Sequence, residues 1–182
     1  MGANAYTSAR LNTKGKFTHA FGRIEARIKL PTGQGLWPAF WALGEDIDTS
    51  PWPACGEIDI MEARGDVPGV NHGSLHGPGY SGGGALTSPY ALPNMARFPD
   101  AFHLFTLDWS AAGVSFAVDG TTYEQHFPAE VVKASKVWVY DHPFYLLLNV
   151  AVGGNFSGNP DTTTVFPQTM LVDYVRAYDR KP

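Results

Sequence analysis

Three acidic residues within six positions could carry out acid–base and nucleophilic chemistry. They are Glu57, Asp59 and Glu62, in the segment Glu-Ile-Asp-Ile-Met-Glu. The alternation of acids with Ile58 and Ile60 predicts a β-strand, because alternate residues of a strand point to the same face. Glu57 and Asp59 would then share one face. Glu62 has the opposite parity, and a regular strand would direct it to the apolar side, where burial of a lone carboxylate is costly.

One extra residue in this strand would return Glu62 to the face of the other two acids. We therefore expect a β-bulge near Met61, since bulges are frequent beside active sites, where they re-aim a side chain. All three acids would then line one groove. Strand positions four regular steps apart lie roughly 13 Å apart along the backbone. Side chains that lean inward can approach the spacing of about 5–5.5 Å between the two carboxyls of retaining glycosidases.

The middle acid could give the two outer acids different roles. Packed like charges raise the pKa of at least one carboxyl, and carboxyls that hydrogen-bond share a proton. We hypothesise that Asp59 bonds to Glu57 and orients it. Glu57 would stay ionised as a nucleophile, and Glu62 would stay protonated as a general acid. The alternatives are a solvated acidic strand face and a calcium site.

Aromatic residues and histidines flank the acids in sequence. The segment Gly33 to Leu43 reads GQGLWPAFWAL, and if it forms a strand beside the acids, Trp37 and Trp41 could stack on sugar rings. Core packing is the alternative for each. His72 and His76 are four residues apart, but no third ligand stands at a spacing typical of a zinc site.

The elements that must position these residues are short strands separated by turns. Apolar and polar residues alternate, or apolar residues run together, in several segments, and clusters of Pro and Gly lie between them. Asp119-Gly120 predicts a tight hairpin turn, and only 128–136 has a helical pattern. The sequence therefore predicts an all-β antiparallel sandwich or barrel. The expected strands are residues 21–30, 57–62, 102–109, 114–118, 145–152 and 170–178.

Composition excludes several classes of partner. The chain has 182 residues, which fits a single domain, and a formal net charge of −4. No basic face is expected for nucleic acid, and no apolar run reaches the length of a membrane span. The glycine run 82–84 is not followed by the lysine and helix of a phosphate-binding loop. Cys55 is the single cysteine, so no intramolecular disulfide can form, and a buried thiol is expected.

Six segments together resemble glycoside hydrolase family 16, in its laminarinase-like branch. They read GLWPAFWAL, GEIDIMEARG, HGPGYSGG, FHLFTLDW, LLLNVAVGG and FPQTMLVDYVRAY, and they extend over nearly the whole chain. The resemblance implies a β-jelly-roll sandwich of the concanavalin A-like type, with an open substrate cleft. It also implies an endo-β-1,3-glucanase that retains configuration through a double displacement. The expected ligand is β-1,3-glucan or mixed β-1,3/1,4-glucan.

The resemblance assigns roles to individual residues. Glu57 matches the nucleophile, Asp59 the assisting acid and Glu62 the acid/base, and the extra Met61 matches the bulged form of the motif. His76 is expected near the catalytic subsite. The remaining candidates for sugar contact are Arg23, Trp37, Trp41, Trp109 and Asn149.

The resemblance also implies features beyond the catalytic residues. Domains of the family begin with further strands, so the single catalytic domain expected over residues 1–182 is N-terminally shortened. Asp173 resembles the side-chain ligand of a structural calcium, with a solvated or ion-paired strand residue as the alternative. No cofactor is expected for catalysis. Family members are secreted, although the first residues lack the pattern of a signal peptide, and a monomer is expected. The rival functions are a non-catalytic β-glucan-binding module and hydrolysis of another polysaccharide, such as a galactan.

Overall fold

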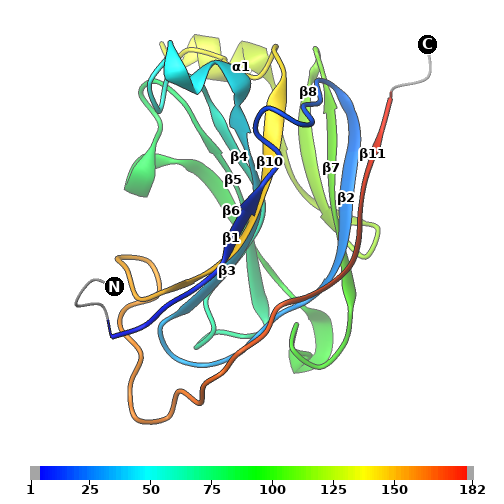
Figure 1. Ribbon diagram of the computed structural model, residues 1–182. Helices are drawn as coiled ribbons and strands as arrows, with labels where there is room; N and C mark the ends of the chain where they lie inside the picture. The colour runs from blue at the N-terminus through cyan, green and yellow to red at the C-terminus, as the bar shows by residue number, and fades with distance from the viewer. Residues whose placement is uncertain (1–4, 180–182) are drawn as a thin grey trace.

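The computed structural model describes residues 5–179, which form a sandwich of two antiparallel β-sheets (Figure 1). One sheet has six strands in the order β1-β10-β3-β4-β5-β6, and the other has five in the order β11-β2-β7-β8-β9. This arrangement confirms the prediction of an all-β jelly-roll sandwich. Within the described residues, no helix is long and apolar enough to cross a lipid bilayer.

The strands are short and mostly joined by turns. The six-stranded sheet contains β1 (Arg10–Asn12), β3 (Leu36–Gly44), β4 (Glu57–Ala63), β5 (Val70–His76), β6 (Leu86–Ala91) and β10 (Phe144–Val152). The five-stranded sheet contains β2 (Gly22–Lys29), β7 (His103–Ser110), β8 (Gly113–Val118), β9 (Thr121–His126) and β11 (Leu171–Tyr178). The helical elements are α1 (Pro128–Lys133) and the 3₁₀ turns η1 (Glu45–Asp48), η2 (Gly82–Gly84) and η3 (Pro93–Met95).

The strands predicted from alternation and apolar runs all form, with ends that differ by at most one residue. The predicted hairpin turn joins β8 to β9, where Asp119 and Gly120 both have positive φ, at 49° and 81°. Two positive φ angles are what a tight turn between right-handed twisted strands requires. Helix α1 is shorter than predicted, because the backbone at Ser135 has a φ of 58° and leaves the helical region.

The core lies between the two sheets. From the six-stranded sheet, the apolar sides of β3, β4 and β10 face inward, including Phe40, Ile58 and Leu146. From the other sheet, β2, β7 and β8 contribute alternate residues such as Ile24 and Phe116. The opposite side of the six-stranded sheet, called the groove face below, points away from this core. Residues on that face can therefore serve a site without contributing to the core between the sheets.

Candidate active site

A bulge in β4 brings all three acids to the groove face. Glu57 and Asp59 pair regularly with β5, but the register shifts between Asp59 and Glu62, so that Ile60 and Met61 together occupy the place of one residue. The pairing with β3 shifts at the same point. Ile60 and Met61 are both buried in the core. The bulge predicted from the parity of Glu62 is confirmed, and it lets this carboxylate avoid the apolar interior.

Each acid lies in a row that crosses the sheet from β3 through β4 to β5. Glu57 lies between Leu43 and His76, Asp59 between Trp41 and Ser74, and Glu62 between Ala39 and His72. Directly paired residues share a face, so these rows place Trp41 and both histidines on the groove face with the acids. Ala39 has no side chain beyond its Cβ. It therefore leaves open space in front of Glu62.

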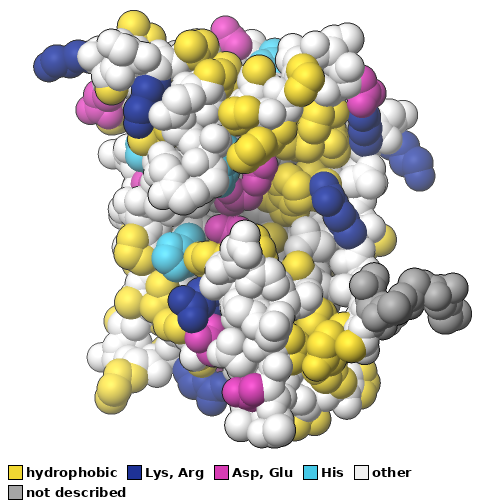
Figure 2. Space-filling model, turned by 90° about the vertical axis from the view of Figure 1, so that its left-hand side faces the viewer, with side chains coloured by type: hydrophobic (Ala, Val, Ile, Leu, Met, Phe, Trp, Pro, Cys, Tyr) yellow, Lys and Arg dark blue, Asp and Glu magenta, His cyan; other side chains and the backbone are white. Residues whose placement is uncertain are grey.

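A groove of about 370 Å³ lies over these rows. Figure 2 shows acidic side chains and a histidine in the hollowed middle of this side of the molecule. The three acids form part of the lining, and residues of β3, β10, β1 and the segment just before β1 form the rest. The lining residues are Ser8, Ala9, Arg10, Trp37, Ala39, Trp41, Glu57, Asp59, Glu62, Asn149, Val150 and Ala151.

Two indole N–H groups each donate a hydrogen bond to one of the outer acids. Trp52 Nε1 donates to Glu57 Oε2 at 2.6 Å, and Trp37 Nε1 donates to Glu62 Oε1 at 2.8 Å. A donor stabilises the ionised form of a carboxyl and fixes which oxygen accepts. Each outer acid is thus left with one oxygen free of an indole donor.

The electrostatics of the site favour protons on the acids. Burial, followed by the charge of Asp59, raises the pKa of Glu57 to about 8. Burial and the neighbouring Glu62 raise the pKa of Asp59, whose residue is only 3% exposed, well above its usual range. Burial also raises the pKa of Glu62. The pKa directions do not separate nucleophile from acid as the sequence analysis expected. Each outer acid also accepts one indole N–H, so the hydrogen bonds from the tryptophans do not separate the two acids either.

His76 adds a donor to the centre of the site. Its Nδ1 accepts the backbone N–H of Gly82 at 3.0 Å, so the ring proton lies on Nε2, which is 3.0 Å from Asp59 Oδ2. The distance is that of a hydrogen bond, but the alignment is not, because Asp59 Oδ2 has no hydrogen-bond partner among the described residues. Ligand atoms of Glu57, Asp59 and His76 lie within 4.8 Å of one another. A metal ion would need the Nε2 lone pair, which the proton occupies, so these residues do not fit a metal centre.

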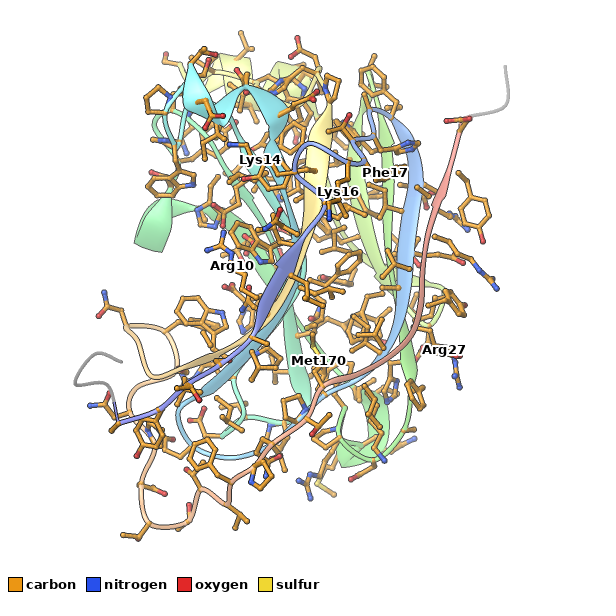
Figure 3. All side chains as sticks on the ribbon, in the orientation of Figure 1. Arg10, Lys14, Lys16, Phe17, Arg27 and Met170 are labelled. Atoms are coloured by element: carbon orange, nitrogen blue, oxygen red, sulfur yellow. The ribbon has the colours of Figure 1, made fainter. Side chains whose placement is uncertain are left out.

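Trp41 and Asn149 lie together on the groove face. Trp41 Nε1 donates to Asn149 Oδ1 at 2.8 Å, and the guanidinium of Arg10 lies 4.7 Å from the centre of the Trp41 ring. Figure 3 shows Arg10 projecting from β1 toward the groove, whereas Arg27 projects from the opposite sheet. The structure thus brings Trp37, Trp41, His76 and Asn149 together with the acids.

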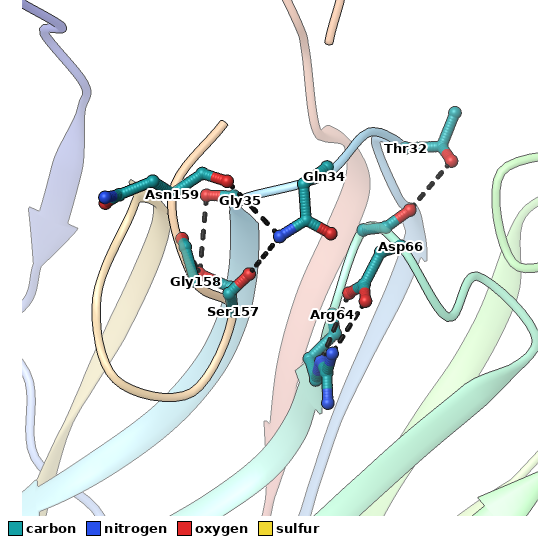
Figure 4. Close-up of polar contacts among 9 residues, drawn as sticks. Thr32, Gln34, Gly35, Arg64, Asp66, Ser157, Gly158 and Asn159 are labelled. Atoms are coloured by element: carbon teal, nitrogen blue, oxygen red, sulfur yellow. Dashed lines mark hydrogen bonds and ion pairs between the residues drawn. The ribbon is translucent and has the colours of Figure 1, made fainter. Parts of the chain in front are cut away.

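A loop after β10 closes the groove beside Glu62. Its Phe156 ring packs against Trp37, with ring centres 5.2 Å apart, and against the edge of His72, at 5.5 Å. Gln34 holds the loop by donating from Nε2 to the carbonyls of Ser157 and Asn159, at 3.0 and 3.2 Å (Figure 4). The loop therefore has a fixed position relative to β3.

Gly35 allows this loop to approach the start of β3. It has a φ of 78°, and a Cβ there would collide with the backbone nitrogen of Pro160. Glycine is the residue that adopts this conformation without strain.

A second loop, between β3 and β4, carries Trp52 to Glu57. Cys55 is a buried free thiol in this loop and packs against Leu43, Tyr145 and Leu147, which form a small apolar cluster separate from the main core. The buried structural thiol expected from the sequence is confirmed.

Two predicted sugar contacts are wrong. Trp109 is 2% exposed and lies in the core, where its Nε1 donates to the carbonyl of Tyr140. Arg23 lies on the outer face of the five-stranded sheet and forms a double hydrogen bond with Asp108, at 2.8 Å for each contact. It lines a different groove of about 390 Å³. The two grooves are similar in size. Glu57, Asp59 and Glu62 line the groove of about 370 Å³, which is therefore the candidate active site.

Asp173 is the extra residue in a bulge of β11. Its carboxylate forms an ion pair with Arg27 at 2.8 Å, and this guanidinium would repel a calcium ion. Among residues 5–179, Asp173 belongs to no cluster of three acids or histidines that could hold a metal. The residues around Asp173 do not fit a calcium site, and they match the ion-paired alternative. Binding of calcium itself stays a prediction.

Sequence reasoning missed three residues of the site: Arg10, Trp52 and Phe156. Each lies on an edge strand or a loop, where no periodicity indicates the direction of a side chain. For Trp52, its position five residues before Glu57 was the one available signal.

The chain is similar to several known proteins. The family model described as "Glycosyl hydrolases family 16" matches residues 1–176. The laminarinase catalytic domain of Thermotoga maritima superposes with a TM-score of 0.94 at 47% identity, over 95% of this chain and 69% of that chain. The endo-β-1,3-glucanase of Pyrococcus furiosus superposes with a TM-score of 0.92 at 50% identity, over 93% and 65%. Glucan endo-1,3-β-glucosidase A1 of Niallia circulans is 39% identical over 95% of this chain, which spans 26% of that protein's length.

Proposed function

The chain belongs to glycosyl hydrolase family 16, and from this premise we propose that it hydrolyses internal bonds of β-1,3-glucan or mixed β-1,3/1,4-glucan. The observation that carries the proposal is the bulge in β4, which presents Glu57 and Glu62 on one face of a groove. The similarity to proteins named as laminarinase and endo-β-1,3-glucanase supports the choice of substrate.

In the first step, Glu57 attacks the anomeric carbon of the sugar as a carboxylate. The bond from that carbon to the leaving oxygen breaks, and Glu62 gives its proton to the oxygen. Trp37 occupies Oε1 of Glu62, which leaves Oε2 to carry this proton. The products are a glycosyl ester on Glu57 and a shortened glucan with a free hydroxyl.

In the second step, Glu62 is ionised and acts as a base. It takes a proton from a water molecule, whose oxygen attacks the anomeric carbon as the ester bond to Glu57 breaks. Glu57 returns to its carboxylate form, and Glu62 is protonated again. Two inversions at one carbon give net retention of configuration.

Asp59 allows Glu57 to become ionised by accepting its proton. Burial raises the pKa of both Glu57 and Asp59, so that the pair retains a proton at neutral pH. Movement of this proton to Asp59 leaves Glu57 charged and able to attack. The shared proton avoids two buried charges side by side, which would be costly.

The aromatic residues of β3 would bind the sugar. Trp41 and Trp37 flank the space over Ala39, and apolar ring faces suit the C–H faces of glucose. Arg10 and Asn149 line the same groove and offer hydrogen-bonding groups to hydroxyls. A neutral polysaccharide fits this mixture of aromatic and polar groups. A polymer of this kind is met outside the cell, so we also propose an extracellular site of action, for a monomer.

The binding-module alternative gives the three acids no comparable role. A binding module needs no pair of buried carboxyls, and keeping three with raised pKa values costs stability. A galactan hydrolase would use the same acids with a different set of sugar contacts. The linkage must therefore be tested directly.

The test is hydrolysis of laminarin, lichenan and agarose in parallel, measured as reducing ends and by analysis of the oligosaccharides released. We expect release from laminarin, and NMR of the first product is expected to show the β anomer. Binding to laminarin without release would support the module, and release from agarose alone would support the galactan hydrolase. Glu57→Gln is the control, because it preserves the shape of the side chain and removes the nucleophile.

A further inference from the structure

The hydrogen bond from Trp52 to Glu57 has a specific consequence for the reaction. Its length, 2.6 Å from Nε1 to Oε2, is short for a bond to a carboxyl. Trp52 is also 44% exposed, so its ring is not held by burial in the core. The contact is therefore a local interaction between one indole N–H and one catalytic oxygen.

The loop that carries Trp52 is held on both sides of the indole. Backbone bonds close turns from Ala54 to the carbonyl of Pro51 at 2.9 Å, and from Gly56 to that of Pro53 at 3.1 Å. Cys55 anchors the loop in the apolar cluster on the groove face. The indole therefore reaches Glu57 from a rigid support, and the oxygen that accepts its hydrogen bond is fixed in place.

We infer that Trp52 is a positioning residue, whose indole N–H selects Oε1 of Glu57 as the attacking oxygen and keeps this acid ionised at lower pH. Oε2 is occupied by the indole and cannot turn toward the sugar without losing the bond. The inference rests on the proposed function of Glu57 as nucleophile.

Burial and the charge of Asp59 raise the pKa of Glu57 and oppose its ionisation, whereas the nearby His76 and the bond from Trp52 lower this pKa. Glu62 lies further along the same strand, and Leu43, the partner of Glu57 on β3, carries no charge. Trp52 is thus the neutral donor that acts directly on the nucleophile.

Sugar stacking is the rival role for Trp52. The exposed ring lies 6.1 Å from His76 between ring centres and could contact a bound sugar. Phe keeps an aromatic face and lacks the N–H, so Trp52→Phe separates the two roles. Trp37→Phe is the matched control, because it removes the equivalent donor from Glu62.

The two substitutions are expected to shift opposite limbs of the pH profile of kcat/KM on laminarin. Loss of the donor raises the pKa of the affected acid. Trp52→Phe therefore moves the acidic limb upward by about one pH unit, with about a tenfold loss of kcat/KM below it and little change in KM. Trp37→Phe moves the basic limb upward by a similar amount, because Glu62 must be protonated for the first step.

An unchanged acidic limb in Trp52→Phe, with a raised KM in Trp52→Ala, would overturn the inference in favour of stacking. NMR of the five indole N–H groups gives a test that needs no activity. The Trp52 signal, assigned from its loss in Trp52→Phe, is expected to move with pH in the native protein and to stay constant in Glu57→Gln. A Trp52 signal that ignores pH would overturn the bond itself. A native protein that hydrolyses no glucan but shows this titration would leave the bond intact and refute the proposed function.

Discussion

Replacing Glu57 by Gln is expected to abolish hydrolysis and also to stabilise the folded protein at neutral and alkaline pH. Burial and Asp59 raise the pKa of Glu57 from an ordinary 4.5 to about 8. The folded protein therefore holds a proton that the unfolded chain releases. The stability that this acid contributes is full below about pH 4.5 and is lost as the pH rises through about 8. Gln has the same shape, carries no charge and still offers Trp52 an acceptor oxygen.

The size of this effect follows from the two pKa values. The difference between 4.5 and about 8 corresponds to roughly 5 kcal/mol of destabilisation above pH 8. At pH 7 the unfolded carboxyl is ionised while the folded one is mostly protonated, which makes the cost of Glu57 roughly 3 kcal/mol. For 182 residues, each kcal/mol changes Tm by about 2–4 °C, so the Gln variant is expected to melt roughly 6–12 °C higher.

Thermal unfolding followed by circular dichroism at about pH 4, 7 and 9 measures this difference. The native protein, Glu57→Gln and the control Glu130→Gln are compared, because Glu130 is exposed on α1 and far in sequence from the acids. We expect the Tm gain of Glu57→Gln to be small at the lowest pH and large at the highest, and Glu130→Gln to follow the native protein. Equal Tm values for Glu57→Gln and native protein at pH 7, or a gain independent of pH, would refute the electrostatic reasoning.

Three further substitutions test other parts of the site. Glu62→Ala is expected to lower kcat on laminarin by about 10²–10⁴-fold, but to lower it far less on an aryl glycoside, whose phenolate leaves without a proton. Steady-state kinetics on both substrates measures the two losses, and equal losses would contradict the role of Glu62 as an acid. Met61→Ala empties a fully buried position of the bulge and is expected to destabilise the fold by about 2–5 kcal/mol in urea unfolding; a loss under about 1 kcal/mol would show that the bulge can collapse around the smaller side chain. Gly35→Ala introduces a clash with Pro160 at positive φ and is expected to lower Tm and to raise KM by displacing the loop of Phe156. An unchanged Tm would argue against that constraint.

The strands and the placement of the three acids on one face could be predicted from sequence because they depend on parity. Alternation placed Glu57 and Asp59 opposite Ile58, and the wrong parity of Glu62 predicted the bulge. These are local consequences of strand geometry, and the register of β4 confirms them. Strands β1, β5 and β6 are absent from the expected strands. The first has three exposed residues, the second has few apolar residues and a central glycine, and the third contains a proline.

The same parity argument could have corrected one error. In FHLFTLDW, Phe105, Leu107 and Trp109 are alternate residues, and all three face the core. The apolar pattern therefore indicated an inward Trp109, against the sugar contact taken from resemblance.

The place of Arg23 could not be predicted in this way. Alternation shows that Arg23 and Ile24 point to opposite faces of β2, but not which of the two sheets β2 joins. The position of Trp52 also depends on tertiary structure, because the loop around Cys55 sets its direction.

The two faces of strand β4 have different roles. Ile58, Ile60 and Met61 pack in the core, while Glu57, Asp59 and Glu62 line the groove. The aromatic and polar residues of the groove lie mainly on neighbouring strands and loops. Changes of substrate preference can therefore accumulate on β3, β10 and the loop of Phe156 with little effect on folding. Strand β4 itself tolerates few substitutions, in evolution or in protein engineering, because nearly every position in it carries one of the three acids or packs in the core.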